Sequence, residues 1–394
     1  MRGRRGFCAD CGRAALGLPL LSLVACSRQA STTPAPKDAA GAGNRWDELV
    51  AVLEKQLPTL LAKATTVPAV SMALVTDAKL RWRGAFGVKD FGSKVPVDPD
   101  TVFEAGSVSK TVFAYEILKL CEKGVMNLDT PLTKYTPDRF LKGDPRLDLI
   151  TARHVLSHKT GFPNWRSDKE PLAIQFTPGE RWSYSGEGYS YLQSVMTHLT
   201  GHVDTNTCKT LYDGLRMCAT DFDGNMKANL FVPFGMTSSG YLYREGMARP
   251  HDEKGSMLAA RKATAIEAAR YGSAGELHTT PTDYARFLSE LLDPKPSDQY
   301  RLTPASLQEM VRPQAKITDS LSWGLGWAIE HTKSGGELIS HSGDNPGFKA
   351  MTAASREKKT AFIIMTNGDR GFDDIIIPIM KSEPMQRFLP VTVG

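Results

Sequence analysis

The sequence lacks several features that would point to particular classes of protein. No apolar run reaches the roughly 18 residues that a membrane-spanning helix needs, and no segment repeats, which argues against a solenoid. There is no dense stripe of Lys and Arg with interleaved aromatic residues, so no nucleic-acid partner is expected. With 394 residues, 41% of them hydrophobic and 23% charged, the chain has the composition of a globular protein with a large core.

Signature motifs of several enzyme classes are also missing. The chain contains no G-x-S-x-G, H-E-x-x-H, P-loop or G-x-G-x-x-G sequence, so nothing indicates a nucleophile elbow, a zinc protease site or a nucleotide-binding loop. His154 with His158, and His198 with His202, have the four-residue spacing of helical metal ligands, but neither pair has an obvious third ligand nearby. We therefore predict neither a metal ion nor an organic cofactor.

The first 26 residues predict a targeting segment. A positive start is followed by an apolar stretch from Ala14 to Ala25. The stretch ends in Leu23-Val24-Ala25-Cys26, which resembles the bacterial lipobox, where the cysteine is lipidated and becomes the first residue. We expect residues 1–25 to be removed and residues 26–44, rich in Ala, Thr and Pro, to form a flexible tether. A lipid on Cys26 would then hold the protein at the bacterial cell envelope, facing the periplasm or the exterior; a plain secretory signal is the alternative.

Charge and cysteine usage change once this leader is set aside. Most of the formal net charge of +5 belongs to the leader, which carries four arginines and a single acidic residue. Cys8 and Cys11 fall in the leader, and Cys121 is expected on the core side of a helix. Cys208 and Cys218 could form a disulfide in an oxidising compartment or remain a free buried pair.

The pattern of apolar residues predicts a mixed α/β fold of the α+β type. Two strands, 68–76 and 79–86, follow a helix over 46–64 and are joined by a turn at Asp77-Ala78. A helix from Ser107 to Glu122 opens a mostly helical region that reaches about residue 292. The end of the chain returns to strands and closes with a helix, over 323–330, 338–341, 348–355, 360–366 and 373–388. We predict one antiparallel sheet built from both chain ends and flanked by helices, with a helical lobe at about 103–292, in a catalytic domain spanning 45–388.

The start of the helix at Ser107 has the residues of an activated nucleophile. A serine hydroxyl reacts only when a nearby base takes its proton, and a lysine serves as that base if burial lowers its pKa. In Ser107-Val108-Ser109-Lys110 the two groups lie three residues apart, on one face of the helix. Ser355-Arg356-Glu357-Lys358 has the same spacing but lies in a charged turn, where nothing would bury the lysine.

Five segments in order resemble the serine β-lactamase and penicillin-binding protein family. They are Phe103-Glu104-Ala105-Gly106-Ser107-Val108-Ser109-Lys110-Thr111, Leu156-Ser157-His158-Lys159-Thr160-Gly161-Phe162-Pro163, Pro178-Gly179-Glu180-Arg181-Trp182-Ser183-Tyr184-Ser185, Phe234-Gly235-Met236-Thr237-Ser238-Ser239-Gly240 and His341-Ser342-Gly343. The resemblance implies a two-lobe β-lactamase-like fold with the active site in the cleft between the lobes. It also implies that Ser107 is acylated, that Lys110 is the base and that Tyr184 shuttles the proton.

The same resemblance assigns the substrate-binding strand. His341, Ser342 and Gly343 stand where many relatives carry Lys-Thr-Gly, and the backbone N–H of Asp344 would form an oxyanion hole with that of Ser107. Two departures matter for the substrate. Gly186 stands where the family's Tyr-x-Asn motif has an asparagine, and His341 is largely neutral at pH 7, so it would attract a substrate carboxylate poorly.

These departures favour an ester hydrolase with a small-molecule substrate. The alternatives are a D-amino-acid-specific peptidase or carboxypeptidase, a class C-like β-lactamase and, from another class, a non-catalytic binding lipoprotein. Arg370, just after the last strand, is the candidate cation for a substrate carboxylate. The segment from His202 to Asn229 is longer than the resemblance leads us to expect. Its Asp221-Phe222-Asp223-Gly224-Asn225 run lacks the full calcium ligand series, so we predict a solvated insertion.

Overall fold

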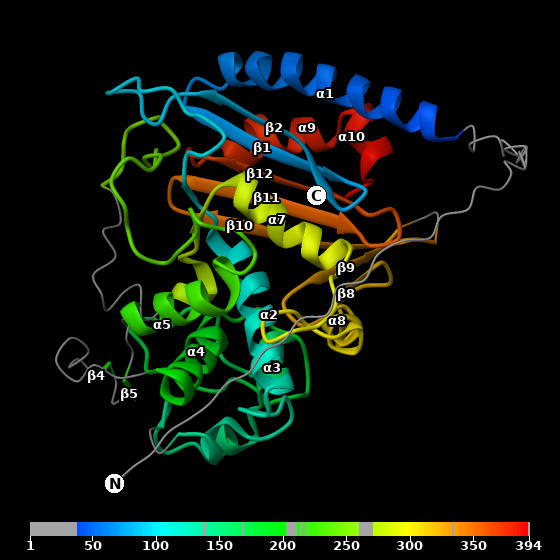
Figure 1. Ribbon diagram of the computed structural model, residues 1–394. Helices are drawn as coiled ribbons and strands as arrows, with labels where there is room; N and C mark the ends of the chain where they lie inside the picture. The colour runs from blue at the N-terminus through cyan, green and yellow to red at the C-terminus, as the bar shows by residue number, and fades with distance from the viewer. Residues whose placement is uncertain are drawn as a thin grey trace, which may run out of the picture. The chain divides into compact units, whose positions relative to one another are not determined.

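An eight-stranded antiparallel sheet forms the centre of the fold (Figure 1). Its strand order is β2 (Lys79–Gly87), β1 (Ala69–Thr76), β12 (Thr360–Thr366), β11 (Phe348–Ser355), β10 (Glu337–Asn345), β9 (Ala328–His331), β8 (Leu321–Trp323) and β7 (Ala315–Lys316). The computed structural model describes residues 38–136, 139–167, 169–201, 211–212, 215–216, 219–259, 271–332 and 335–392. The leader, the lipobox with Cys26, and Cys208 and Cys218 lie outside these ranges.

The two ends of the chain meet where β1 pairs with β12. Met72 lies opposite Ile364 in this antiparallel ladder, so the prediction of a sheet built from both chain ends is confirmed. The predicted turn between the first two strands is also present. Asp77 and Ala78 both have positive φ, at 51° and 56°, the backbone of the tight hairpin turn that matches the right-handed twist of paired strands.

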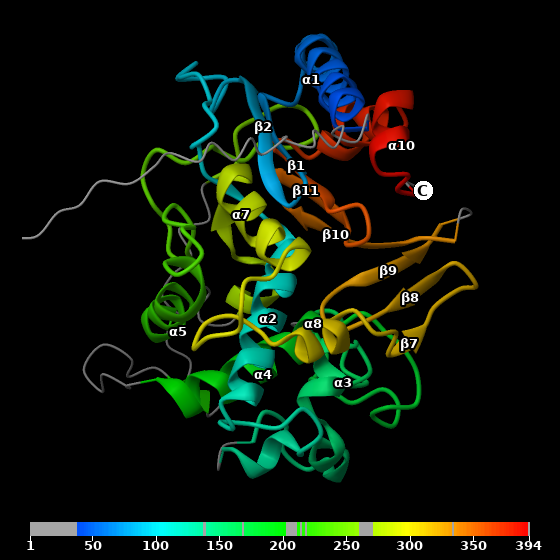
Figure 2. The same ribbon diagram turned by 45° about the vertical axis from the view of Figure 1, so that its right-hand side comes forward.

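Helices cover both faces of the sheet (Figure 2). On one face, residues 46–63 of α1 (Asp38–Lys63), together with α9 (Ile377–Met380) and α10 (Glu383–Phe388), pack on a cluster that includes Met72 and Leu74 of β1. On the other face, α7 (Pro281–Leu292) and the helical lobe pack on a cluster that includes Ala73 and Val75. Alternate side chains of β1 therefore enter different cores, which explains why this strand is an almost continuous apolar run.

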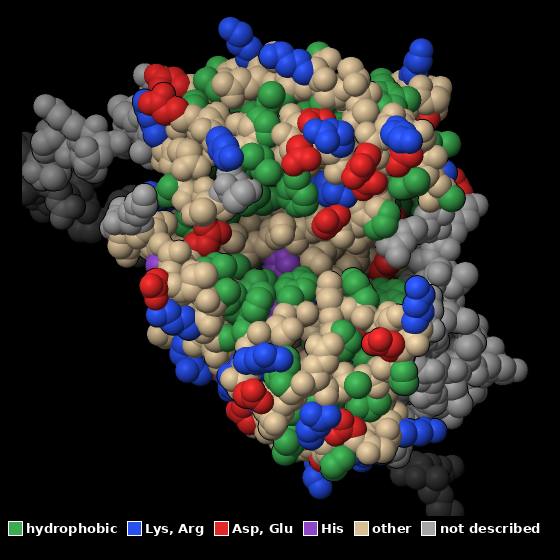
Figure 3. Space-filling model, turned by 180° about the vertical axis from the view of Figure 1, so that it is seen from behind, with side chains coloured by type: hydrophobic (Ala, Val, Ile, Leu, Met, Phe, Trp, Pro, Cys, Tyr) green, Lys and Arg blue, Asp and Glu red, His purple; other side chains and the backbone are tan. Residues whose placement is uncertain are grey.

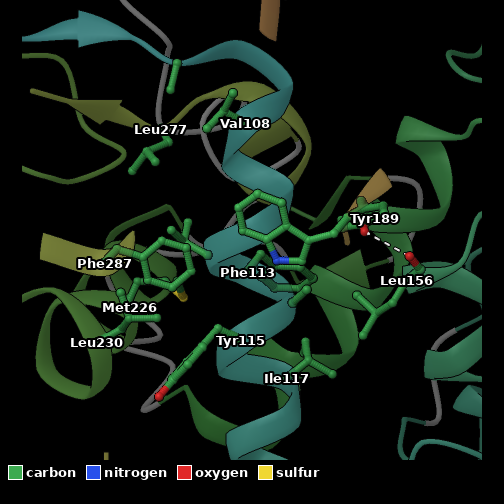
Figure 4. Close-up of a cluster of buried hydrophobic side chains, with 14 of the residues drawn as sticks. Val108, Phe113, Tyr115, Ile117, Leu156, Tyr189, Met226, Leu230, Leu277 and Phe287 are labelled. Carbon is green, nitrogen blue, oxygen red and sulfur yellow. Dashed lines mark hydrogen bonds between the residues drawn. The ribbon is translucent and has the colours of Figure 1, made fainter. Parts of the chain in front are cut away.

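Helix α2 (Ser109–Glu122) runs through the core of the helical lobe (Figure 4). All of its residues from Ser109 to Leu120 are buried. Phe113 contacts the ring of Tyr189 on α4 (Gly186–Thr200), and Tyr115 contacts Phe287 on α7. A helix packed on all sides has little freedom to move, so the residues at its start are held in a defined position.

The remaining described elements connect these parts. They are β3 (Phe103–Glu104), η1 (Gly106–Val108), η2 (Leu132–Lys134), η3 (Pro145–Leu149), α3 (Ala152–Leu156), β4 (Leu211–Tyr212), β5 (Leu215–Arg216), α5 (Ala219–Met226), η4 (Lys227–Phe231), β6 (His278–Thr279), α8 (Pro304–Met310) and η5 (Phe372–Ile376). No helix in the described ranges has both the length and the hydrophobicity of a membrane-spanning segment.

Several boundaries differ from the sequence prediction. The single strand expected over 323–330 is a hairpin, β8 and β9, which turns at Gly326 with φ +84°. The last helix is broken into three short pieces, because Pro378 and Pro384 each begin a new helix. Helix α1 begins at Asp38, inside the segment 26–44 that was expected to be a tether. Helix α7, placed in the helical lobe by its sequence position, instead packs against β1 and β12.

The prediction of a solvated insertion from His202 to Asn229 was wrong for residues 219–229. Residues 219–231 form α5 and η4, and Phe222, Met226 and Leu230 enter the core at four-residue intervals. Asp223 is buried, accepts a hydrogen bond from the backbone N–H of Tyr241 and forms an ion pair with Lys227 at 2.6 Å. Its carboxylate is thus part of the internal structure of the lobe.

Candidate active site

Ser107 lies in the 3-10 turn η1, which leads directly into α2. The turn is pressed against strand β10 by two glycines. A Cβ on Gly106, where φ is +54°, would lie 2.7 Å from the backbone nitrogen of Asp344, and one on Gly343 would lie 2.0 Å from the carbonyl oxygen of Ala105. Only glycine permits so close an approach. Two segments far apart in the sequence thus bring Ser107 and Asp344 to the same cleft.

Lys110 follows one turn later and is completely buried. Its Nζ lies 3.1 Å from Ser107 Oγ and donates a hydrogen bond to the carbonyl oxygen of Ala274 at 2.5 Å. Burial lowers the pKa of Lys110 from 10.5 to about 7. Around neutral pH a large share of this lysine is therefore an uncharged amine, whose lone pair can accept a proton from Ser107.

Tyr184 lies beside this pair. Its ring centroid is 4.9 Å from Lys110 Nζ. Burial raises the pKa of the phenol well above its usual value, and a hydrogen bond with Ser107 offsets only part of that increase. Tyr184 is thus a neutral phenol at physiological pH, able to donate or relay a proton but not to act as a standing base.

His158 packs against the ring of Tyr184 and holds it in position. The sequence pattern did not reveal this role. The two rings lie 4.1 Å apart, and His158 Nδ1 accepts a hydrogen bond from the backbone N–H of Ser185 at 3.0 Å. Burial keeps the pKa of His158 well below its usual value, so the ring is neutral. Its place in the motif segment from Leu156 to Pro163 was the available signal. His154, its possible metal partner, has Nδ1 3.1 Å from the carbonyl oxygen of Leu149, and no group of three potential metal ligands occurs within the described ranges.

His341 lies on β10 and is also buried and neutral. Its Nδ1 lies 2.7 Å from the carbonyl oxygen of Ser342, so Nδ1 carries the proton and Nε2 is left as an acceptor. Burial, together with the nearby charge of Lys110, lowers the pKa of His341 to about 3. A cation at this position, which a substrate carboxylate would need, is therefore absent at neutral pH.

A cleft of about 580 Å³ opens in front of these groups. Figure 3 shows it as a groove across one face of the molecule, with a histidine on its floor. Its lining residues are Ser107, Asn164, Trp165, Tyr184, Ala274, Trp323, Ala328, Glu330, Ser340, His341, Ser342, Asp344, Asn345, Met351 and Thr392. Among these described residues two are carboxylates, Glu330 and Asp344, and none is Arg or Lys.

Arg370 does not belong to this lining. Its guanidinium binds the carboxylate of Asp374, at 2.8 and 3.0 Å. The expectation that Arg370 might hold a substrate carboxylate therefore has no support in the structure. In contrast, Asn164, Trp165 and Glu330 line the cleft although no motif singled them out.

The sequence and fold can now be compared with those of known proteins. A family model described as Beta-lactamase matches residues 46–378, most of the chain. The chain belongs to the Beta-lactamase family. The prediction made from the five motif segments is thereby confirmed at the level of the family.

Two curated relatives of this Beta-lactamase family member show how distant its similarities are. A penicillin-binding protein of Bacillus subtilis is 25% identical over 320 residues, which cover 72% of this chain and 64% of the relative. The chain thus spans slightly less than two thirds of that relative's length. The D-alanyl-D-alanine-carboxypeptidase/endopeptidase AmpH of Escherichia coli is 23% identical over 346 residues, covering 80% of this chain and 86% of the relative.

Solved structures support the same fold. The octameric penicillin-binding protein homologue from Pyrococcus abyssi aligns with a TM-score of 0.67 at 20% identity, covering 86% of this chain and 79% of that one. The D-amino acid amidase from Ochrobactrum anthropi aligns at 0.65 and 20% identity, over 85% and 99% of the two chains. The predicted β-lactamase-like fold, an antiparallel sheet with flanking helices, is therefore confirmed.

Proposed function

We propose that this chain is a serine hydrolase in which Ser107 is acylated by the substrate and then released by water. The observation that carries the proposal is the buried Lys110 amine, 3.1 Å from Ser107 Oγ and with a pKa near 7. An amine that is partly uncharged at neutral pH and already hydrogen-bonded to a serine is the arrangement that nucleophilic catalysis requires. No such base stands beside Ser355, the other serine of an S-x-x-K pattern, because Lys358 is exposed in the turn after β11.

In the proposed reaction, Lys110 takes the proton of Ser107 as Oγ attacks the carbonyl carbon of the substrate. The backbone N–H groups of Ser107 and Asp344 stabilise the oxyanion, a role supported by the close approach of Gly106 and Gly343. Tyr184 relays a proton to the leaving group, which departs as the carbon–oxygen double bond re-forms. Water then attacks the acyl-Ser107 ester, and Ser107 recovers its proton.

We further propose that the preferred substrates are esters without a carboxylate near the scissile bond. His341 is neutral, Arg370 is bound to Asp374, and the described residues that line the cleft include no Lys or Arg. A penicillin, a cephalosporin or the free carboxyl end of a peptide would bring its negative charge close to Glu330, whereas the charge of Asp344 is offset by Lys349, whose Nζ lies 2.8 Å from its carboxylate. This electrostatic argument disfavours the β-lactamase and carboxypeptidase alternatives.

A second candidate is hydrolysis of D-amino-acid amides or peptides with a free amino group. Glu330 is the observation that favours it, because this carboxylate lines the cleft and, among the described residues, accepts hydrogen bonds from one hydroxyl and one backbone N–H, those of Ser340 and Thr392. A substrate ammonium would complete its partners. The fold is also shared with a D-amino acid amidase. A panel with D-phenylalanine amide, p-nitrophenyl butyrate and a cephalosporin separates the three activities.

The nucleophile is tested with a fluorophosphonate, which labels activated serines. We expect wild-type protein to gain one adduct, on Ser107, and Ser107→Ala to gain none and to lose p-nitrophenyl butyrate hydrolysis by at least about three orders of magnitude. Ser355→Ala is the matched control from the second S-x-x-K pattern and should behave as wild type. If the wild-type protein takes no fluorophosphonate label and hydrolyses no ester, the result would instead favour the alternative of a non-catalytic binding lipoprotein.

We also propose that the protein is held at the bacterial cell envelope by a lipid on Cys26. The Leu23-Val24-Ala25-Cys26 sequence at the end of an apolar stretch supports the proposal. The catalytic cleft would then face the periplasm or the exterior.

A further inference from the structure

The loop after Pro163 occupies the part of the cleft next to Gly186. A Cβ atom on Gly186 would lie 2.6 Å from two atoms of the Trp165 indole and 2.8 Å from the main-chain oxygen of Asn164. Asn164 and Trp165 both line the cleft together with Ser107. Asn164 and Trp165, which come from another segment, therefore fill the space that a side chain at residue 186 would occupy.

Main-chain hydrogen bonds determine which way the Asn164 amide points. The backbone N–H of Gly186 donates to the side-chain oxygen of Asn164 and to its main-chain oxygen, at 3.0 Å each. Because a backbone N–H can only donate, the amide oxygen must face α4, and the NH₂ group points away from it. Asn164 is exposed, and no described residue accepts a hydrogen bond from this NH₂.

The loop is fastened on both sides of Asn164. Ser185 Oγ donates to the carbonyl oxygen of Pro163 at 2.9 Å, and the backbone N–H of Glu187 donates to the main-chain oxygen of Asn164 at 3.0 Å. Arg166 binds the completely buried carboxylate of Glu187 through its backbone N–H, Nε and Nη2, at 3.0, 3.1 and 2.9 Å. A buried, charge-assisted contact with three hydrogen bonds holds the loop firmly. The NH₂ group of Asn164 is thus a donor held in place before any substrate arrives.

From this geometry we infer that Asn164 is a substrate-binding residue whose NH₂ donates to a second carbonyl oxygen in the acyl part of the substrate. The acyl part stays on Ser107 through acylation and hydrolysis, so a fixed donor in the cleft acts on it in both steps. The substrates it selects are acyl compounds with an amide or ester carbonyl close to the scissile group, such as N-acyl amino-acid esters. This inference rests on the proposed hydrolysis through Ser107.

Two esters of equal chain length isolate the contact. The p-nitrophenyl ester of N-acetylglycine carries an amide in its acyl chain, and the p-nitrophenyl ester of pentanoic acid has methylene groups there. Asn164→Asp removes the NH₂ donor but keeps an oxygen for the N–H of Gly186, and Asn164→Ala removes the donor without adding charge. Asn127→Asp is the matched control, because Asn127 is exposed outside the cleft lining and its side-chain oxygen also accepts a backbone N–H, from Asp129 at 2.8 Å.

We expect both Asn164 variants to lose about three- to tenfold in kcat/KM on the N-acetylglycine ester relative to the pentanoate ester, the effect of one hydrogen bond. Asn127→Asp should leave the ratio unchanged, and the rate of fluorophosphonate labelling should show that the variants retain the folded site. Wild-type ratios in both Asn164 variants would overturn the inference while leaving the hydrolase proposal intact. A wild-type protein that hydrolyses neither ester and takes no label would overturn the hydrolase proposal, and this inference with it.

Discussion

Lys110 links the chemistry of the cleft to pH. As a base it must be uncharged, and its pKa near 7 means that acidification removes the reactive form. We therefore expect kcat/KM for p-nitrophenyl butyrate to rise about tenfold per pH unit below pH 7 and to level off above it. Stopped assays between pH 5 and 9, corrected for spontaneous hydrolysis, measure the profile.

Tyr184→Phe provides the control for that profile. Because the pKa of Tyr184 lies well above this range, the variant should be slower at every pH but should keep the same ascending limb. A wild-type rate that does not change with pH would contradict the assignment of Lys110 as the base. If the rise in kcat/KM below pH 7 disappears in Tyr184→Phe, the tyrosine and not Lys110 would be the base.

Gly186 provides a second prediction at the scale of single residues. Restoring an asparagine there, as in the Tyr-x-Asn pattern, should not produce a β-lactamase, because the new side chain would collide with Trp165 and Asn164. We expect Gly186→Asn to lower the free energy of unfolding by about 1–3 kcal/mol, the usual cost of overpacking, and to slow ester hydrolysis. Trp165→Ala in the same chain should recover only the part of the lost stability that the indole causes, because the main-chain oxygen of Asn164 remains 2.8 Å from the added Cβ.

Gly224→Asn on α5 is the matched control for this substitution, because nothing lies within 4 Å of a Cβ at Gly224. Its unfolding in urea should therefore be close to that of the wild type. If Gly186→Asn is equally harmless, the indole does not occupy the space in solution as it does in the structure.

At the scale of elements, α2 carries a buried acid that makes stability depend on pH. Glu116 is completely buried, neither carboxylate oxygen has a partner among the described residues, and burial raises its pKa to about 8 despite Lys123 and Lys119. The folded protein thus keeps a proton that the unfolded chain releases above about pH 4.5. The free energy of unfolding should fall as pH rises from about 4.5 to 8.

Glu116→Gln cannot ionise and should remove this dependence. We expect the variant to unfold with a free energy higher than that of the wild type by on the order of 3 kcal/mol at pH 7, with little difference near pH 4.5. Urea titrations at the two pH values test it. Glu122 on the same helix is the opposite case, because hydrogen bonds from Lys119, Ser306 and Thr303 outweigh its burial and hold its pKa at about 2. Glu122→Gln should therefore destabilise the protein at pH 7.

Other elements show where sequence patterns were sufficient. The turn at Asp77-Ala78 and strands β1, β2, β11 and β12 follow from local signals, namely alternating or continuous apolar residues bounded by turn residues. The hairpin of β8 and β9 could not be predicted from local signals, because the residues from Trp323 to Glu330 also fit one longer strand. Gly326 turns the chain there with a φ of +84°, and it packs so close to α2 that a Cβ would lie 2.6 Å from the side chain of Ala114. No local pattern contains that contact.

At the scale of the whole molecule, the proposed lipid anchor is tested by phase partitioning. Full-length protein made in a bacterium should enter the detergent phase of Triton X-114, and Cys26→Ser should remain in the aqueous phase. Cys121→Ser controls for loss of a thiol as such, because Cys121 is partly buried against the core of the lobe. Equal partitioning of wild type and Cys26→Ser would leave a plain secretory signal.

Sequence alone determined the features that depend on local order. The S-x-x-K spacing on one helical turn singled out Ser107 and Lys110, and the apolar periodicity predicted the fold class. The resemblance carried by the five ordered segments implied the family and added Tyr184 and His341 as candidates. Only the tertiary structure decided the environment of these residues. The pKa of Lys110 near 7, the neutral state of His341 and the entry of Asn164 into the space beside Gly186 all arise from contacts between distant segments. Burial and close approach are properties of the packed chain, and no short stretch of sequence contains them.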